Sequence, residues 1–333
     1  MSLAWFTVAA FAGFLDEQGQ LPSLPDKEGV AGSFAGVSHG ALLVAGGANF
    51  PDKKPWEGGK KVWTDAVFVL EKPTGAWKLA GRLPRPLGYG VSATHRDSVV
   101  CVGGGNADGH YSDAFRLEWQ DGKLTTTALP SLPEPIANAC GALVGDALYI
   151  AGGQTRPNST TASPKVWSLD FAAAELKWKE REPLPGDGRI LSVAAACNGA
   201  FFVAGGTELM GGRRRYLKDV HRFTPNGGWK RVADLLQPVV AAPSPAPSDD
   251  CGFFILGGDD GSQTNVQPQA HRGFSAAVFH YDVKADRWSE HGELRAPRVT
   301  TPCVPWRDSW VIPSGEMRPG VRSPEVWTWK AGR

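Results

Sequence analysis

LLVAGG, at residues 42–47, places four apolar residues before a pair of glycines, and this pattern returns five more times along the chain. The later copies are VCVGGG at 100–105, LYIAGG at 148–153, FFVAGG at 201–206, FFILGG at 253–258 and a degraded WVIPSG at 310–315. Successive copies end 58, 48, 53, 52 and 57 residues apart. Such a period of about 50 residues indicates a chain built from repeated supersecondary units.

Each repeat contains further strand patterns on both sides of its glycine pair. In the second repeat, GVSATH at 90–95 precedes the pair and AFRL at 114–117 follows it. A tryptophan opens another strand in most repeats, as Trp77 does in the first, and a leucine-proline turn follows at Leu83. Short aromatic and β-branched runs between glycine and proline turns favour strands. We therefore expect four antiparallel strands per repeat, called a, b, c and d in chain order.

The repeat length, the strand number and the glycine pair are typical of kelch repeats. The chain resembles the kelch family over nearly its whole length, which predicts one all-β domain over residues 1–333, a six-bladed kelch-type β-propeller. The expected repeats cover roughly 31–86, 87–134, 135–187, 188–237, 238–296, and 297–333 together with 1–30. The sixth repeat lacks a d strand of its own. We expect the segment near Phe14–Leu21 to complete that blade and close the ring.

Composition limits the classes of partner. The 333 residues carry 35 Lys and Arg against 34 Asp and Glu, a formal net charge of +1, which argues against binding to nucleic acid or an anionic membrane. The apolar run Leu3–Leu15 is too short to span a bilayer. No basic residue precedes it, so it is either a signal-peptide remnant or the ring-closing strand. Five widely spaced cysteines without a CxxC pair predict small buried side chains rather than a disulfide or metal framework.

The loops are unequal in length at the two ends of the expected propeller. Consecutive antiparallel strands reverse direction, so the b–c and d–a connections share one end and the a–b and c–d turns share the other. The long loops are b–c loops, at 48–62, 154–165, 207–218, 259–275 and 316–324. Extra residues on one face mark it as the binding face. We expect substrate-binding residues there at Asn49, Tyr89, Asn138, Arg189 and Arg298, the last four at roughly equivalent points facing the axis.

The sixth b–c loop departs most from the repeat, and such departures often mark function. Its sequence, PSGEMRPGVR at 313–322, places Glu316 and Arg322 six residues apart with a Pro-Gly turn between them. A carboxylate can move protons to and from a sugar hydroxyl, and an arginine fork matches a carboxylate ligand. A surface ion pair is the alternative interpretation of the same spacing.

Three stretches carry a more specific resemblance. PDKEGVAGSFAGVSHGALLVAGGANF at 25–50, GYGVS at 88–92 and GEMRPGVR at 315–322 resemble the N-acetylneuraminate (sialic acid) mutarotases, also called N-acetylneuraminate epimerases. Those proteins are six-bladed kelch propellers in which the Gly-Glu…Gly-x-Arg loop precedes the PDG-type segment, whereas here it lies at the C-terminus. The resemblance therefore points to a cyclically permuted branch. It implies that Glu316 is the catalytic glutamate and that Arg322 is a functionally required arginine.

The resemblance implies a cofactor-free, metal-free interconversion of the α and β anomers of sialic acid, in the periplasm or as a secreted protein. Opening the sugar ring needs a base at the anomeric hydroxyl and an acid at the ring oxygen. Glu316 is the expected base, and Arg322 is expected to hold the substrate carboxylate. The acid is left open between water, Tyr89 and Arg298.

Other functions remain compatible with the sequence. A non-catalytic kelch module could bind a glycan or protein on the same face, and a permuted mutarotase could act on a different sugar. A kelch copper oxidase needs tyrosine and histidine ligands that converge at the axis, whereas the five Tyr and seven His here are scattered. DDGSQ at 259–263 resembles the start of a calcium loop without its closing glutamate, so a turn is favoured.

Overall fold

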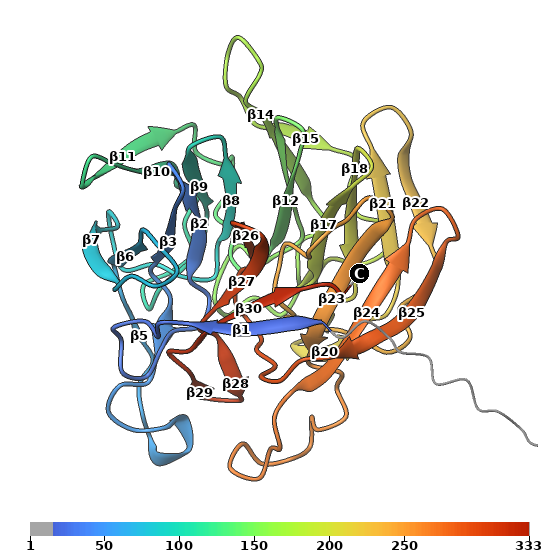
Figure 1. The fold of residues 1–333 in the computed structure, drawn as a ribbon. Coiled ribbons are helices and arrows are strands. Elements are labelled where there is room, and N and C mark those ends of the chain that lie inside the picture. Colours follow the sequence, from blue (N-terminus) through green and yellow to red (C-terminus); the bar gives the residue numbers. More distant parts are fainter. Residues whose placement is uncertain (1–15, 333) are drawn as a thin grey trace, which may run out of the picture.

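The structure is a computed structural model, and it describes residues 16–332. Nearly all regular structure in that range is antiparallel strand, joined by one short 3-10 helix, η1 (Pro55–Glu57) (Figure 1). The apolar run Leu3–Leu15, and with it Phe14 of the expected closing strand, lies outside the described residues. Within the described range, no helix is long and apolar enough to cross a membrane.

Four sheets follow one another along the chain, and each contains four strands. The first is built from β2 (Phe34–Ser38), β3 (Ala41–Ala45), β6 (Ala66–Leu70) and β7 (Lys78–Arg82). The second is built from β8 (Val91–His95), β9 (Ser98–Val102), β10 (Ala114–Gln120) and β11 (Lys123–Leu129). The third is built from β12 (Cys140–Val144), β13 (Ala147–Ala151), β14 (Val166–Asp170) and β15 (Lys179–Arg181). The fourth is built from β17 (Val193–Cys197), β18 (Ala200–Ala204), β21 (Val220–Thr224) and β22 (Gly228–Val232).

The fifth sheet corrects the expectation of four strands in every repeat. It contains only β23 (Gly252–Gly258), β24 (Ser275–Asp282) and β25 (Arg287–Glu293). In place of an a strand, the segment PSPAPS at 243–248 makes one isolated bridge, Ser248 to Phe253. Its three prolines have no amide hydrogen, so the segment cannot sustain a ladder of hydrogen bonds.

The sixth sheet joins the two ends of the described chain. It contains β26 (Val304–Trp306), β27 (Ser309–Pro313) and β30 (Val326–Lys330), and the N-terminal strand β1 (Glu17–Leu21) pairs antiparallel with β30. This pairing supplies the fourth strand that the sixth repeat lacks. The Asp16 carboxylate holds the junction, because it accepts hydrogen bonds from Trp329 Nε1 at 2.9 Å and from the amide of Gly332 at 3.1 Å.

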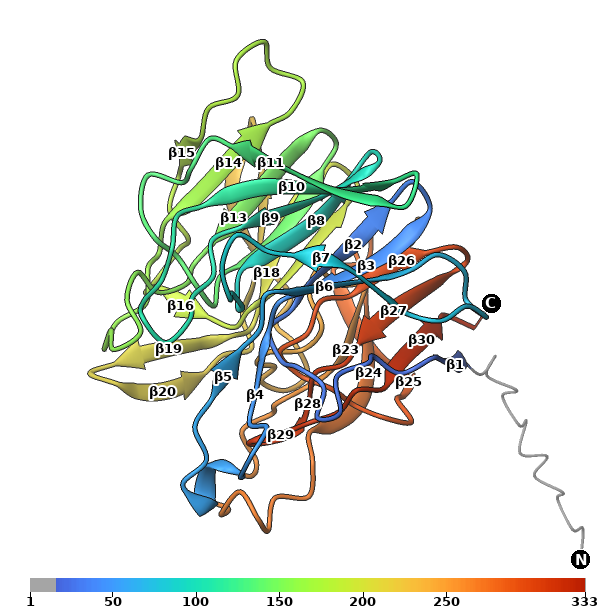
Figure 2. The same cartoon turned by 90° about the vertical axis from the view of Figure 1, so that its left-hand side faces the viewer.

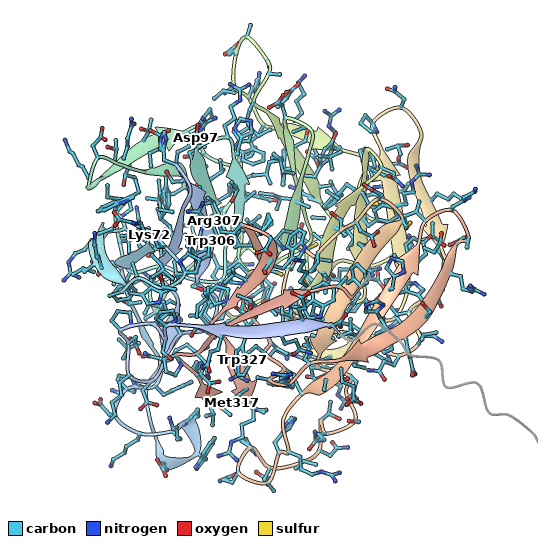
Figure 3. All side chains as sticks on the ribbon, viewed as in Figure 1. Lys72, Asp97, Trp306, Arg307, Met317 and Trp327 are labelled. Atoms are coloured by element: carbon cyan, nitrogen blue, oxygen red, sulfur yellow. The ribbon has the colours of Figure 1, made fainter. Side chains whose placement is uncertain are left out.

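The remaining strands are short and belong to the b–c loops and their neighbours. They are β4 (Ala48–Asn49) with β5 (Val62–Trp63), β16 (Arg189–Ile190) with β19 (Thr207–Met210) and β20 (Arg213–Tyr216), and β28 (Glu316–Arg318) with β29 (Val321–Arg322). Figure 2 shows these hairpins at the same lower end of the molecule. Figure 3 agrees, with Met317 of β28 at this end and the turn residues Asp97 and Arg307 above it. Long loops therefore gather at one end, as the strand directions predict.

The hydrophobic core lies between the sheets. One cluster, which includes Phe34 and Phe115, joins the first and second sheets, and further clusters join the second to the third, the third to the fourth and the fourth to the fifth. Another joins the fifth to the sixth around Phe254 and Trp329. A last cluster packs the sixth sheet against the first, with Trp306 beside residues of β2 and β3. Each sheet therefore buries both of its faces against neighbours.

Six residues in the d–a connections form a closed circle of backbone hydrogen bonds. They are Gly32, Tyr89, Asn138, Leu191, Ala241 and Thr300. The amide of each donates to the carbonyl oxygen of the one before it, and Gly32 donates to Thr300, with lengths of 2.7–2.9 Å. All six have positive φ, between 55° and 68°. Positive φ is uncommon for residues with side chains, so this shared conformation fixes the six connections at one equivalent point.

The glycine pair has a clear structural reason. A Cβ on Gly46 would lie 2.3 Å from the carbonyl oxygen of Leu87, and the amide of Gly47 donates to that same oxygen at 2.8 Å. Both glycines have positive φ. In the sixth repeat Ser314 replaces the first glycine at a φ of 61°, and its hydroxyl contacts the carbonyl oxygen of Ser323 at 2.7 Å. The degraded copy therefore keeps the turn and adds a tie to the loop that follows.

The cysteines mostly match the expectation of small buried side chains. Cys101, Cys140, Cys197 and Cys303 are buried, and burial raises the pKa of each thiol. Cys251 is exposed, which corrects the prediction at that position. It stands in the turn before β23, where the preceding prolines interrupt the sheet.

Candidate functional site

A cleft of about 630 Å³ lies at the end that carries the long loops. The b–c loops of all six repeats and five of the six residues of the hydrogen-bonded circle contribute to its lining. Its charged side chains are Lys61, Arg214, Asp259, Glu316 and Arg322. This volume is within the range of small-molecule sites. The cleft is therefore the place where the predicted catalytic residues can meet a small-molecule ligand.

Glu316 has one carboxylate oxygen held and one free. Its Oε1 accepts a hydrogen bond from Arg322 Nη1 at 2.9 Å and another from the amide of Gly320 at 2.6 Å. Oε2 makes no hydrogen bond to residues 16–332 and is not buried, and the side chain keeps 17% of its surface exposed. The carboxylate is thus fixed through one oxygen, and the other is available to exchange a proton with a ligand.

Arg322 is nearly enclosed, with 4% of its side chain exposed. Its guanidinium lies 4.8 Å from the centre of the Phe50 ring, and its Nε is buried without a hydrogen-bond partner in the described chain. The pair with Glu316 leaves little of the Arg322 charge unbalanced. In the structure Arg322 therefore supports the Glu316 carboxylate, and its contact with a substrate carboxylate stays a prediction.

The first b–c loop supports this hairpin from outside. A Cβ on Gly320 would lie 2.8 Å from Pro55 Cγ and 3.1 Å from Trp56 Cζ3, so the η1 turn packs directly on the Pro-Gly turn between β28 and β29. Lys54, next to η1, ties the loop to the segment before β2, because its Nζ donates a hydrogen bond to Glu28 at 2.5 Å. The repeats at the two ends of the sequence thus build the site together.

Glu316 occupies a position that every repeat shares. The residues that directly follow the glycine pair are Ala48, Gly105, Gln154, Thr207, Asp259 and Glu316, and each pairs with a d–a connection through a short ladder or bridge. Asp259 is therefore a second carboxylate at the same level, one repeat before Glu316, and it lines the cleft. The DDGSQ motif predicted only a turn at this position.

Asp259 is held in two ways. Its Oδ1 accepts from the amide of Gly261 at 3.0 Å, which is the predicted turn, and its Oδ2 accepts from the hydroxyl of Tyr216 at 2.8 Å. Burial, together with this carboxylate, raises the pKa of Tyr216 to about 12. The phenol therefore stays protonated at neutral pH and can donate its hydrogen to Asp259 Oδ2.

Two predicted binding residues are in the cleft. Tyr89 and Asn138 line it, and both belong to the hydrogen-bonded circle. The Asn138 amide group donates to Gln154 Oε1 at 3.3 Å, and the Tyr89 hydroxyl is buried without a partner in the described chain. His110 also lines the cleft, and burial lowers its pKa, so its ring is neutral near pH 7.

Arg189 and Arg298 are not in the cleft, which corrects the prediction that they face the axis. The positions equivalent to Tyr89 are Leu191 and Thr300, two residues further along. Both arginines are buried. Arg189 forms a bidentate pair with Asp219 at 2.9 and 3.0 Å, and Arg298 is paired with Glu325. Their charges are satisfied within the fold.

The Asn49 side chain is also held by hydrogen bonds within the fold. Its side-chain amide donates to the Asp26 carboxylate at 3.1 Å and to the carbonyl oxygen of Gly29 at 3.0 Å, and the residue is buried. It is absent from the residues that line the cleft. Asn49 therefore ties the start of the first b–c loop to the segment before β2.

Metal ligation finds no obvious place in the described part of the chain. No three His, Cys, Asp or Glu side chains between residues 16 and 332 are grouped closely enough to hold a metal ion. Tyr89 and His110 are the tyrosine and histidine among the lining residues of the cleft. Both belong to the second repeat, and no hydrogen bond or ring contact joins them in residues 16–332 to favour the copper-oxidase alternative.

Comparison with known proteins points to one family. Residues 15–126 match the N-acetylneuraminate epimerase family (NANM). The similarity is to the N-acetylneuraminate epimerases. Curated proteins of that name are 44% identical over 110 residues in Yersinia enterocolitica and 43% identical over 118 residues in Salmonella enteritidis. These alignments cover 29% and 32% of this chain, and 27% and 30% of the relatives. The chain therefore matches less than a third of their length.

The matched range includes the segments at 25–50 and 88–92 and ends before Glu316 and Arg322. A solved structure, described as "Structure of YjhT", extends the comparison to the fold. It has a TM-score of 0.68, covers 92% of this chain and 96% of its own, and is 16% identical in sequence. At that identity the likeness concerns the fold alone.

Proposed function

We propose that the chain forms a single six-bladed kelch-type β-propeller. Six sheets, the core clusters between successive sheets and the closed circle of backbone hydrogen bonds support this architecture. A closed ring also accounts for the altered order of the family segments, because cutting it between different blades leaves the same contacts. The pairing of β1 with β30 is then the closure that a permuted chain requires.

We further propose that the protein is a sialic acid mutarotase, which interconverts the α and β anomers of N-acetylneuraminate. The observation that carries this proposal is Glu316, with Oε1 held by Arg322 and Gly320 and Oε2 free in a cleft of sugar size. The similarity of residues 15–126 to the N-acetylneuraminate epimerases supplies the substrate class.

The reaction follows from the position of one proton acceptor. Glu316 Oε2 takes the proton of the anomeric hydroxyl, the bond between C2 and the ring oxygen breaks, and the ring oxygen receives a proton from an acid. C2 is now a ketone carbon. After rotation, the ring oxygen attacks the other face of C2 and returns its proton, and Glu316 gives its proton back to the new hydroxyl. The acid is then water or Tyr89, because Arg298 is buried, is paired with Glu325 and does not line the cleft.

We place the protein in the periplasm or outside the cell, in carbohydrate metabolism, on the resemblance alone. A non-catalytic kelch module remains the alternative, and so does a mutarotase for a different sugar. Time-resolved proton NMR on freshly dissolved β-N-acetylneuraminate separates these functions. The mutarotase predicts faster equilibration than in buffer, a binding module predicts shifted sugar resonances at the buffer rate, and a different substrate predicts acceleration with another sugar.

A further inference from the structure

Two cations of the cleft lie on the same aromatic ring but differ in their pairing. The Arg322 guanidinium is 4.8 Å and Lys61 Nζ is 6.0 Å from the centre of the Phe50 ring. Arg322 is bonded to Glu316 at 2.9 Å. No carboxylate of residues 16–332 lies within 4.0 Å of Lys61 Nζ. Lys61 therefore brings an unbalanced positive charge to this wall of the cleft.

Lys61 is oriented by three rings. Its Nζ is 5.0 Å from the centre of the Tyr89 ring and 5.6 Å from that of Trp63, besides its contact with Phe50. All three aromatic residues line the cleft. Cation–π contacts hold the ammonium near the ring faces but offer it no hydrogen-bond acceptor. Its three N–H donors remain available to a ligand.

The charges of the lining fit a ligand with one negative charge. Three basic side chains face two acidic ones, and His110 is neutral because burial lowers its pKa. The third cation, Arg214, comes from the fourth b–c loop. It lies two residues from Tyr216 on the same face of β20, and Tyr216 bonds to Asp259. Lys61 instead lies over the Phe50 ring, as does Arg322, which is bonded to Glu316.

We propose that Lys61 binds the carboxylate of the sugar acid and is the residue that selects an acidic over a neutral sugar. This inference rests on the proposed function. It divides the roles of the two cations, because Arg322 positions the Glu316 carboxylate while Lys61 fixes the substrate carboxylate beside it. The carboxylate and the anomeric hydroxyl are both attached to C2, so a receptor close to the Glu316 hairpin places that hydroxyl within reach of the base.

The test compares Lys61→Met with Lys60→Met by NMR titration of N-acetylneuraminate and of its methyl ester. Methionine keeps an apolar stem over the three rings and removes the charge, and Lys60 is a matched exposed lysine outside the cleft lining. Lys61→Met should raise the dissociation constant of the acid by about tenfold and that of the ester by less than about twofold. Lys60→Met should change neither, and Lys61→Arg should recover most of the affinity.

The kinetic signature is a rise in KM that is larger than the fall in kcat, because Lys61 binds the substrate while Glu316 and its supports are intact. Equal weakening of acid and ester binding in Lys61→Met would overturn the proposal. So would a selective loss of acid binding in Arg214→Met rather than in Lys61→Met, or a wild-type protein that binds neither compound. A wild-type protein that binds the acid through Lys61 but does not accelerate anomerisation would leave this inference standing and remove the proposed activity.

Discussion

Gly320→Ala tests whether the first b–c loop supports the β28–β29 hairpin, which carries Glu316 and Arg322. The added Cβ would lie 2.8 Å from Pro55 Cγ, 3.0 Å from Pro55 Cδ and 3.1 Å from Trp56 Cζ3, at a φ of +79°. The left-handed backbone costs a residue with a side chain about 1–2 kcal/mol. Relieving the overlap with Pro55 adds about 1–3 kcal/mol. The free energy of unfolding should therefore fall by about 2–5 kcal/mol.

Gly58→Ala is the matched control, because Gly58 has a φ of +82° and no atom lies within 4 Å of its added Cβ. It incurs the backbone cost without the overlap. Urea unfolding should show Gly320→Ala less stable than Gly58→Ala by about 1–3 kcal/mol. Displacing the hairpin also weakens the bond from the Gly320 amide to Glu316 Oε1. Under the proposed function, anomerisation should therefore slow by about tenfold in this variant alone. Equal stability losses in the two variants would refute the packing argument.

Two further changes test the reassigned residues. Asp219→Asn should lower the free energy of unfolding at pH 7 by about 3–5 kcal/mol, because it leaves the buried Arg189 without its counter-ion. Burial alone would raise the pKa of Asp219, but bonds from His221 and Arg189 hold it well below the usual 3.8. The ionised Asp219 therefore stabilises the fold fully above its unfolded pKa, and this contribution is lost as pH falls. The stability difference between Asp219→Asn and wild type should shrink by about 1 kcal/mol at pH 3. A difference that stays constant with pH in urea unfolding would contradict this. Asn49→Ala should destabilise the fold by about 1–3 kcal/mol, because it leaves the Asp26 carboxylate and the Gly29 carbonyl without their donor. A raised KM without a loss of stability would instead show that Asn49 binds the substrate.

The sequence predicts most of the fold because the glycine pairs have a strict backbone role. Gly46 and Gly47 take positive φ where the chain meets Leu87, so the pattern marks each b strand directly. The pairing of β1 with β30 follows from counting strands in the last repeat. The missing a strand of the fifth repeat was not predicted, although the prolines at 243, 245 and 247 carry that information.

Some residues of the candidate site could likewise be predicted from the sequence, and others could not. Glu316 and Arg322 meet across a two-strand hairpin, which their spacing around a Pro-Gly turn predicts. Arg189 and Arg298 were misplaced because the d–a connections were aligned two residues out of register. That shift exchanges a position in the hydrogen-bonded circle for a buried, ion-paired one. Asp259 could have been found from its place after the glycine pair, whereas the free charge of Lys61 depends on packing between loops.

The central claim is that Glu316 is the proton acceptor of a sialic acid mutarotase. Time-resolved proton NMR on β-N-acetylneuraminate, with wild-type protein, Glu316→Gln and buffer, tests it most directly. The glutamine oxygen can still accept from Arg322 and Gly320, so the hairpin keeps its shape while the base is removed. The wild type should speed equilibration, and Glu316→Gln should lose at least about 100-fold of that rate. Retained activity in the folded variant, or no acceleration by the wild type, would contradict the account.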